Sequence, residues 1–400
     1  MKKSFLLVIV ILFAAQSLFA QRPECLKNVT YALVSKDDVV EAKREMDKCF
    51  PGYESNADVS LVRANVMLKY YYYEQNRKMK DPAYKFKAPD AIVIANESFY
   101  KAIEQKPDIK ADFGLMDPKE GQLLSADVIR VLAAEALNNK NYKETIKLLN
   151  LVIRSYRVDP KGNALYLAYA FLDMAHCYKM LEDAANYKKT LLDGAKLNVA
   201  VPDIYLGLYD IFKEEKDTVK CGEILTQARK VVPDSLSLLI KAYELGYFAM
   251  IRDTVKLKNA ALKMFEQNKT NIDVITLVAE YLIANKEYLL AEEMIKAGIE
   301  IAPNDFALNH QFTSRYFYEA LDFEAAMNEK VKIKKYLEAK PLRDKSLEIM
   351  RLAIVWAEKA YSIVQDDAKH NLMYSQILVR LDMDVPEELQ QKIDSYKQKD

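Results

Sequence analysis

The chain has 400 residues, and its 58 Lys and Arg residues are balanced by 58 Asp and Glu residues. This neutral balance excludes the strongly basic surface that is typical of nucleic-acid-binding proteins. Hydrophobic residues make up 51% of the chain, which excludes global disorder. Only 9 residues are Gly, and no glycine-rich phosphate-binding motif occurs. Abundant Ala, Leu, Lys and Glu with few glycines indicate an all-α protein.

Residues 1–20 have the pattern of a secretory signal peptide. Lys2 and Lys3 form the charged start, and the apolar run Phe5–Phe13 follows them. Nine residues are few for a membrane span. We therefore expect cleavage before Gln21 and export to the periplasm, with an uncleaved anchor as the alternative.

Four cysteines remain in the exported chain, in a compartment where disulfides persist. Cys25 and Cys49 bracket an expected helical hairpin at residues 25–50, and antiparallel helices bring such ends together. We predict a Cys25–Cys49 disulfide, with two free thiols as the alternative. Cys177 and Cys221 fall at helix-packing positions and are expected to be small core residues.

A helical repeat with a period near 34 residues runs through the middle of the chain, and its clearest unit is Ile272–Pro303. Small residues recur where two helices must approach closely, with large apolar residues beside them: Ala279, Ala291 and Gly298, then Leu282 and Ile295. Similar units begin near Ala126, Ala168, Pro202, Leu236 and Ala307.

This pattern resembles the tetratricopeptide repeat (TPR), over roughly residues 24–340. The resemblance implies an all-α fold, a right-handed α-solenoid of about eight helix-turn-helix repeats with capping helices. We expect divergent helical repeats with long loops at 21–122, the TPR-like array at 123–340, and a helical cap at 341–400. Within these regions the pattern predicts a last repeat unit at 307–338 and a helix that begins at Pro341.

The N-terminal third also resembles a group of exported TPR proteins of Gram-negative bacteria. The resemblance rests on the leader ending Phe-Ala-Gln, on the helix start at Lys36–Lys43, and on the segments Asp81–Ala83 and Ala88–Ala91. It implies a binding role without chemistry of its own.

No motif of a known catalytic or metal site occurs, so we expect no enzyme activity, no metal and no small-molecule cofactor. The three histidines, His176, His310 and His370, lie in units far apart along the sequence. Because only neighbouring repeats of a solenoid touch, we expect no shared histidine site.

The first helices of TPR pairs line a concave groove, and the TPR register assigns residues to it. The candidate binding residues on that register are Arg130, His176, Gln311, Arg315 and Tyr318. Arg and Tyr are enriched at binding hot spots. The alternative is an ordinary solvated face on which Arg315 pairs with a neighbouring acid. The four consecutive tyrosines at 70–73 leave core packing and an exposed platform both open.

The resulting hypothesis is a non-catalytic periplasmic scaffold that binds a peptide or helix of a cell-envelope protein in its groove, with no nucleic acid bound. Peripheral membrane association stays open. The alternative is a glycan-binding helical protein of an outer-membrane uptake system. Asp-Ser/Thr-apolar triplets at Thr218, Ser235 and Thr254 are interpreted as helix N-caps, with O-glycosylation as the other possibility.

Overall fold

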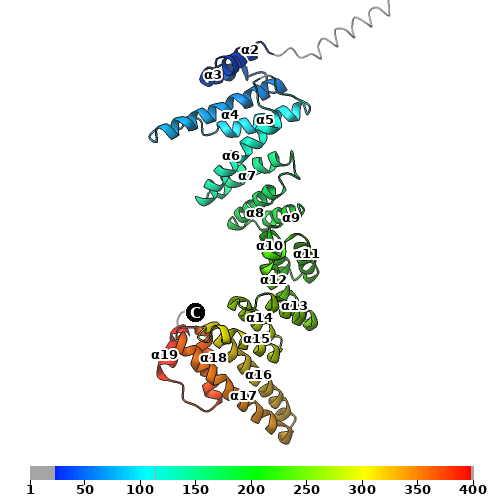
Figure 1. Cartoon of the computed structure of the whole chain (residues 1–400), viewed down its shortest axis with the longest axis vertical. Helices are drawn as coiled ribbons and strands as arrows, with labels where there is room; N and C mark the ends of the chain where they lie inside the picture. The colour runs from blue at the N-terminus through cyan, green and yellow to red at the C-terminus, as the bar shows by residue number, and fades with distance from the viewer. Residues whose placement is uncertain (1–22, 113, 398–400) are drawn as a thin grey trace, which may run out of the picture. The chain divides into compact units, whose positions relative to one another are not determined.

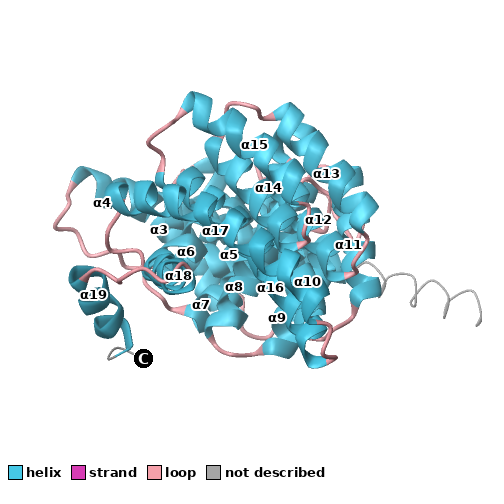
Figure 2. Ribbon diagram, turned by 90° about the horizontal axis from the view of Figure 1, so that it is seen from below, coloured by secondary structure: helices cyan, strands magenta, loops and turns pink. Residues whose placement is uncertain are grey.

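The computed structural model describes residues 23–112 and 114–397, and all regular structure within them is helical (Figures 1 and 2). The expected signal peptide therefore lies outside the described residues. The chain divides into two compact units between Ile211 and Phe212. The helices of unit 1 are α2 (Cys25–Thr30) with a π-helical turn (Tyr31–Ser35), α3 (Val39–Cys49), α4 (Ala57–Lys80), α5 (Ala91–Gln105), α6 (Pro118–Asn138), α7 (Tyr142–Tyr156), α8 (Ala164–Met180) and α9 (Ala184–Ala195).

Helix α10 (Pro202–Glu214) contains the division between the units. The helices of unit 2 are α11 (Thr218–Val231), a short 3-10 turn (Asp234–Leu236), α12 (Leu238–Met250), α13 (Thr254–Gln267), α14 (Ile272–Ala284), α15 (Tyr288–Ile301), α16 (Phe306–Lys332), α17 (Tyr336–Ile363), α18 (Ala368–Arg380) and α19 (Glu387–Lys397). Consecutive helices pack as pairs in both units, which confirms the all-α repeat fold.

The turns inside the helix pairs share one backbone conformation. Each contains a non-glycine residue with φ near +60°: Lys140, Glu182, Lys216, Arg252, Lys286 and Lys334. From Glu182 to Lys286 these residues recur at intervals of 34, 36 and 34. The next N–H then bonds to a carbonyl of the helix just ended, as from Asp217 N to Phe212 O at 2.8 Å. This left-handed closure ends the first helix of each pair in a tight turn.

The same turns begin the second helix of a pair. The side chains of Asp183, Asp217 and Asp253 each accept a hydrogen bond from the backbone N–H three residues on. These bonds satisfy N–H groups that have no partner inside the helix. Thr218 and Thr254 are accordingly the first residues of α11 and α13.

Small side chains let neighbouring helices approach in the array. Ala279 and Ala291 are fully buried in the core of α12–α16. A methyl group placed on Gly298 would lie 2.7 Å from Cδ2 of Leu308, so α15 and α16 need a glycine at their contact. Close helix contacts are therefore the physical reason for the small residues of the repeat pattern.

The first helices of unit 1 form a core of their own around Leu26, Leu33 and Met46. A disulfide joins Cys25 and Cys49 beside this core, with Cα atoms 5.5 Å apart. Cys177 and Cys221 are buried among apolar side chains.

The long connection between α4 and α5 is held by a buried carboxylate. Glu74 is only 1% exposed and accepts hydrogen bonds from the Tyr84 hydroxyl and from Lys87 N–H, at 2.9–3.0 Å. These bonds hold the loop against α4, where Phe86 packs edge-on against Tyr71 at 5.5 Å. The loop is thus an ordered part of unit 1.

The predicted unit 307–338 is wrong in one respect. A TPR-like unit consists of two helices, but α16 is continuous from Phe306 to Lys332. The segment 319–326 contains Glu, Ala, Leu, Asp and Phe, and its three alanines, two glutamates and one leucine are strong helix formers that continue the helix. Helix α17 also starts before Pro341, which lies inside its second turn. The carbonyl that Pro341 leaves unbonded belongs to Leu337, which is 93% exposed and open to water.

No helix among the described residues is long and apolar enough to cross a bilayer.

Candidate functional site

A hollow lies in unit 1 between the first helices of two successive pairs, α6 and α8. It measures about 530 Å³. Its lining residues are Leu123, Leu124, Asp127, Val128, Arg130, Val131, Tyr156, Asn163 and Tyr166. The hollow thus combines aliphatic and aromatic side chains with one carboxylate and one guanidinium.

Two of the large side chains that line this hollow, Val131 and Tyr166, face solvent, and further exposed apolar residues lie on α8. Val131 on α6 is 63% exposed, and on α8 the exposed fractions are 47% for Leu165, 46% for Tyr166 and 48% for Tyr169. We call the surface formed by Asp127, Arg130, Val131, Leu165, Tyr166 and Tyr169 the α6–α8 face. Apolar side chains gathered on an exposed face beside polar groups are typical of a binding surface.

The α6–α8 face carries opposite charges side by side. The buried Tyr156 hydroxyl donates a 2.5 Å hydrogen bond to Asp127, and burial together with this bond raises the pKa of Tyr156. The Arg130 guanidinium lies over the Tyr166 ring, 5.5 Å from its centre. The anchored Asp127 and the stacked Arg130 give the face one fixed acceptor and one fixed donor group.

A second charged pair lies further along α8. Burial raises the pKa of Asp173, against the opposing charges of His176 and Arg130. His176, a predicted groove residue, is exposed and packs edge-on against Tyr142 at 6.3 Å. Arg130 and His176 therefore both belong to unit 1 and share a neighbour in Asp173.

The helix α4 also contributes to this surface. Of its tyrosines, Tyr71 is buried, whereas Tyr72 and Tyr73 are 38% and 36% exposed. The pKa of Tyr72 is raised by burial and by the charges of Tyr71 and Asp127, so Tyr72 lies within electrostatic reach of the α6–α8 face. The tyrosine run is thus divided between the core and an exposed platform.

The other three predicted groove residues lie on α16 in unit 2. Tyr318 is 45% exposed and touches Phe317 edge-on, and Gln311 is half-buried. Arg315 is only 4% exposed, so it is not available to a partner in this structure. Two of the five predicted residues, Arg130 and His176, thus lie in unit 1 and three in unit 2.

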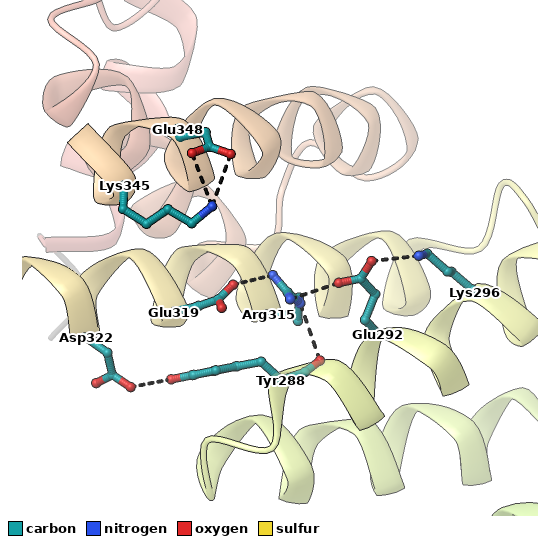
Figure 3. Close-up of polar contacts among 8 residues, drawn as sticks. All are labelled: Tyr288, Glu292, Lys296, Arg315, Glu319, Asp322, Lys345 and Glu348. Atoms are coloured by element: carbon teal, nitrogen blue, oxygen red, sulfur yellow. Dashed lines mark hydrogen bonds and ion pairs between the residues drawn. The ribbon is translucent and has the colours of Figure 1, made fainter. Parts of the chain in front are cut away.

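Arg315 is the centre of a buried ion network between α15 and α16 (Figure 3). Its guanidinium lies 2.9 Å from Glu292 and 2.6 Å from Glu319, and it donates to the Tyr288 carbonyl at 3.4 Å. Tyr288 in turn donates from its hydroxyl to Asp322 at 2.8 Å. The TPR register placed Arg315 in the groove, but carboxylates from its own helix and from α15 bind it inside the helix contact.

Two histidines that the sequence placed far apart are in contact. The Nδ1 atoms of His310 and His370 are 3.0 Å apart, because α18 folds back onto α16. Nε2 of His370 lies 3.0 Å from the Ala357 carbonyl, so this nitrogen donates and the His370 Nδ1 accepts from His310. Burial lowers the pKa of both rings. Within the described residues no group of three or more His, Cys, Asp or Glu side chains that could hold a metal ion occurs.

A smaller hollow of about 240 Å³ lies in unit 2 between α11, α12 and α13. Its cations are largely neutralised by acids: Arg229 pairs with Glu244 at 3.1 Å, and Lys241 lies 3.5 Å from Asp234. Two of its cations are thus already paired with carboxylates, whereas Arg130 on the α6–α8 face stacks on the Tyr166 ring.

Sequence reasoning named Arg130 but missed Tyr166 and Val131. The available signal was the spacing of Leu165, Tyr166 and Tyr169, three large side chains within two turns of one amphipathic helix. These three positions lie within one 100° arc of the helix, and the residues that the structure buries, Leu167, Ala168, Ala170 and Phe171, leave that arc about half exposed.

Three comparisons relate the chain to known proteins. A family model for ChAPs, described as Chs5p-Arf1p-binding proteins, matches residues 178–330, less than half of the chain. A search of curated proteins found no significant match.

Solved structures with helical repeats are similar at low identity. The APC/C hetero-tetramer Cut9-Hcn1 matches with 13% identity and a TM-score of 0.36, covering 90% of this chain and 64% of that one. The C-terminal part of a TPR repeat-containing protein from Cytophaga hutchinsonii shares 18% identity, with a TM-score of 0.36 and coverages of 66% and 98%. Yeast Tom70 shares 12%, with a TM-score of 0.38 and coverages of 95% and 89%. At these identities the likeness concerns the helical fold and not what is bound.

Proposed function

We propose that this protein is a non-catalytic TPR-like scaffold that binds a peptide segment or helix of a protein partner on its α6–α8 face. We further propose that it works in the periplasm, on a partner from the cell envelope. The expected leader at 1–20 supports the location. The partial similarity to a family named for binding Chs5p and Arf1p, both proteins, favours a protein ligand over a small molecule.

The observation that carries the proposal is the exposed apolar surface around the hollow. Val131, Leu165 and Tyr169 are each about half exposed or more, and burying them against a partner would stabilise a complex. The Asp127 carboxylate and the Arg130 guanidinium then fix the register of the bound segment. No activated nucleophile is part of this face, so its chemistry is recognition.

The fitting ligand follows from these groups. Aliphatic or aromatic side chains would enter the hollow, which is large enough for two or three of them. A basic group of the ligand would pair with Asp127, and a carboxylate would pair with Arg130. An amphipathic helix or an extended segment with mixed charges meets these requirements.

The test uses peptide-display selection on the chain that begins at Gln21, followed by affinity measurements on selected peptides. Tyr166→Ala should weaken binding roughly 30-fold, as loss of a hot-spot aromatic does. Leu192→Ala on α9 is the matched control, because Leu192 is also an exposed apolar residue of unit 1, at 37%. Equal affinities for the two variants would refute the α6–α8 face as the binding site.

A photo-crosslinking amino acid at Val131, compared with one at Leu192, tests the proposal in cells. Crosslinks from Val131 to one envelope protein, with none from Leu192, support the scaffold and its location. If selected peptides fail to bind and polysaccharides bind through Tyr166, the protein is a glycan-binding protein instead.

A further inference from the structure

The helical hairpin formed by α16 and α17 is much longer than its neighbours. Its helices have 27 and 28 residues, whereas α14, α15 and α18 have 13 or 14. At 1.5 Å per residue, α16 is about 40 Å long, twice the length of α14. Figure 1 shows the hairpin running past the ends of α15 and α18.

The packed core covers only the base of this hairpin. The C-terminal core of unit 2 reaches Phe323 on α16 and Ile349 on α17 and stops there. The Arg380–Glu324 ion pair, at 3.1 Å, joins α18 to α16 near the same level. Beyond it, residues 327–345 form a projecting end in which α16 and α17 lie side by side (Figure 1). We call this segment the hairpin tip.

Large apolar side chains are concentrated at the hairpin tip. Val331, Ile333, Tyr336 and Leu337 are 40%, 60%, 62% and 93% exposed. They lie in and beside the turn at Lys334 that joins the two helices. Four exposed apolar side chains within seven residues form a cluster, unlike single apolar residues scattered over a surface.

The hairpin tip is also strongly basic in a chain without net charge. Seven cationic side chains stand against three carboxylates, which gives a local charge of +4: Lys330, Lys332, Lys334, Lys335, Lys340, Arg343 and Lys345 against Glu329, Glu338 and Asp344. Glu338 pairs with Lys330 and Lys335, at 2.7 and 3.0 Å. Among the described residues no ion pair occurs for three of the cations, Lys334, Lys340 and Arg343.

The unpaired cations stand beside a small apolar hollow. Met327, Val331, Tyr336 and Ala339 line a depression of about 350 Å³, and Lys340 and Arg343 complete its wall. The hairpin tip therefore presents apolar side chains at its end with Lys334 in the turn among them, and the cations Lys340 and Arg343 follow one to two turns behind along α17.

We propose that the hairpin tip is a peripheral membrane-docking surface for an anionic phospholipid bilayer. Val331, Ile333, Tyr336 and Leu337 enter the interface between headgroups and acyl chains. Lys334, Lys340 and Arg343 bind the phosphates above, since long cationic side chains reach the headgroup level while their stems stay in apolar surroundings.

The composition of the hairpin tip favours a bilayer over a protein surface. Lysine is depleted at protein–protein interfaces, whereas here it makes up six of the seven cations. An anionic bilayer satisfies many loosely placed ammonium groups at once and imposes no register on them. The proposal goes beyond the proposed scaffold function, because it concerns another surface in the other unit.

The test is co-sedimentation of the chain from Gln21 to Asp400 with vesicles. Vesicles of phosphatidylcholine with an equal part of phosphatidylglycerol should bind the protein, and pure phosphatidylcholine should bind it far less. Each cation near an anionic surface strengthens binding roughly fivefold. The triple variant Lys334→Gln, Lys340→Gln, Arg343→Gln should therefore lose roughly 100-fold in vesicle affinity, and added salt should weaken the wild type in the same direction.

The apolar part is tested by Ile333→Ser with Leu337→Ser, which should lose at least tenfold in affinity. The matched control is Leu289→Ser with Val355→Ser, two residues of unit 2 that are 79% and 60% exposed outside the hairpin tip. An environment-sensitive fluorophore on Leu337→Cys should shift to the blue on vesicle binding. Circular dichroism of every variant should match the wild type, since the changed side chains lie outside the core.

Three results overturn the proposal: no binding to anionic vesicles, equal binding of the control and apolar variants, or a fluorophore that stays in water. A hairpin tip that is required for capture of one protein without any vesicle affinity would make it a protein interface instead. Tyr166→Ala should leave vesicle binding unchanged, so failure here and failure of the scaffold function are distinguishable.

Discussion

Replacing Arg315 by Ala is expected to destabilise unit 2, because it leaves two half-buried carboxylates without their shared cation (Figure 3). The side chains of Glu292 and Glu319 are only 17% and 23% exposed, and Arg315 lies within 2.9 Å of both. Its guanidinium also stacks on Tyr316, 4.2 Å from the ring centre. Breaking a buried pair by removing one partner costs about 3–5 kcal/mol.

The lower end of that range applies here. Burial raises the pKa of Glu292, but a hydrogen bond from Lys296 and the charge of Arg315 outweigh it and lower the pKa overall. Since Lys296 remains 2.7 Å from Glu292 in the variant, one of the two acids keeps a partner. We therefore expect a loss of about 3 kcal/mol, which moves the urea midpoint down by roughly 1 M.

The assay is urea unfolding followed by the fluorescence of Trp356, the only tryptophan of the chain. Trp356 stacks on Phe312 at 4.2 Å, one turn from Arg315, and reports this part of unit 2. The matched control is Lys345→Ala, which breaks the exposed Lys345–Glu348 pair of Figure 3 and should cost below about 0.5 kcal/mol. Equal midpoints for Arg315→Ala and Lys345→Ala would refute the view that the Arg315 network is desolvated.

Three further predictions concern stability. Glu182→Gly should raise the melting temperature of unit 1, because Glu182 has a left-handed backbone conformation, φ 58°, that glycine adopts without steric strain. Glycine also raises the entropy of the unfolded chain, so the net gain in the free energy of unfolding should be about 0.5 kcal/mol. Replacing both Cys25 and Cys49 by Ser removes a disulfide that spans 24 residues. The N-terminal helices should lose roughly 3 kcal/mol of stability, measured as faster hydrogen exchange of their backbone amides. Burial and the neighbouring His370 lower the pKa of His310 from 6.5 to about 4, so the unfolded state binds protons more readily. The His310 contribution to the stability of unit 2 should therefore be fully present above about pH 7.5 and fall by roughly 3 kcal/mol toward pH 4, and an Asn variant of both histidines should lose this part of the pH dependence.

Local features of the fold were predictable because the sequence states them directly. Ala279, Ala291 and Gly298 occupy contact positions where any larger side chain would hold two helices apart. Asp217 and Asp253 precede their helices at the place where an acceptor for free N–H groups is needed. Both signals depend on a few neighbouring residues and on the period of the repeat. They can therefore be recognised in the sequence without knowing the contacts between distant elements.

Contacts between elements distant in sequence were not predictable in the same way. Glu319 lies four residues after Arg315, and that pair could be read from the helix alone. Glu292 comes from another helix, and the burial of the pair depends on the angle between α15 and α16. The contact of His310 with His370 likewise depends on α18 folding back over 60 residues of intervening chain. A rule that only neighbouring repeats touch does not hold where the array ends in a cap.

The failure of the repeat frame at residues 319–326 connects the fold with the proposed membrane surface. A turn there would have made residues 322–338 the second helix of an ordinary pair, with Val331 and Ile333 available to pack on the next repeat. Because no residue of this segment ends the helix, α16 continues to Lys332 and carries these side chains beyond the core. Apolar residues that an array would bury are thereby exposed at a basic end. The absence of a turn in this segment is therefore the structural origin of the hairpin tip. A turn engineered near Asp322 should remove the hairpin tip and abolish vesicle binding with it.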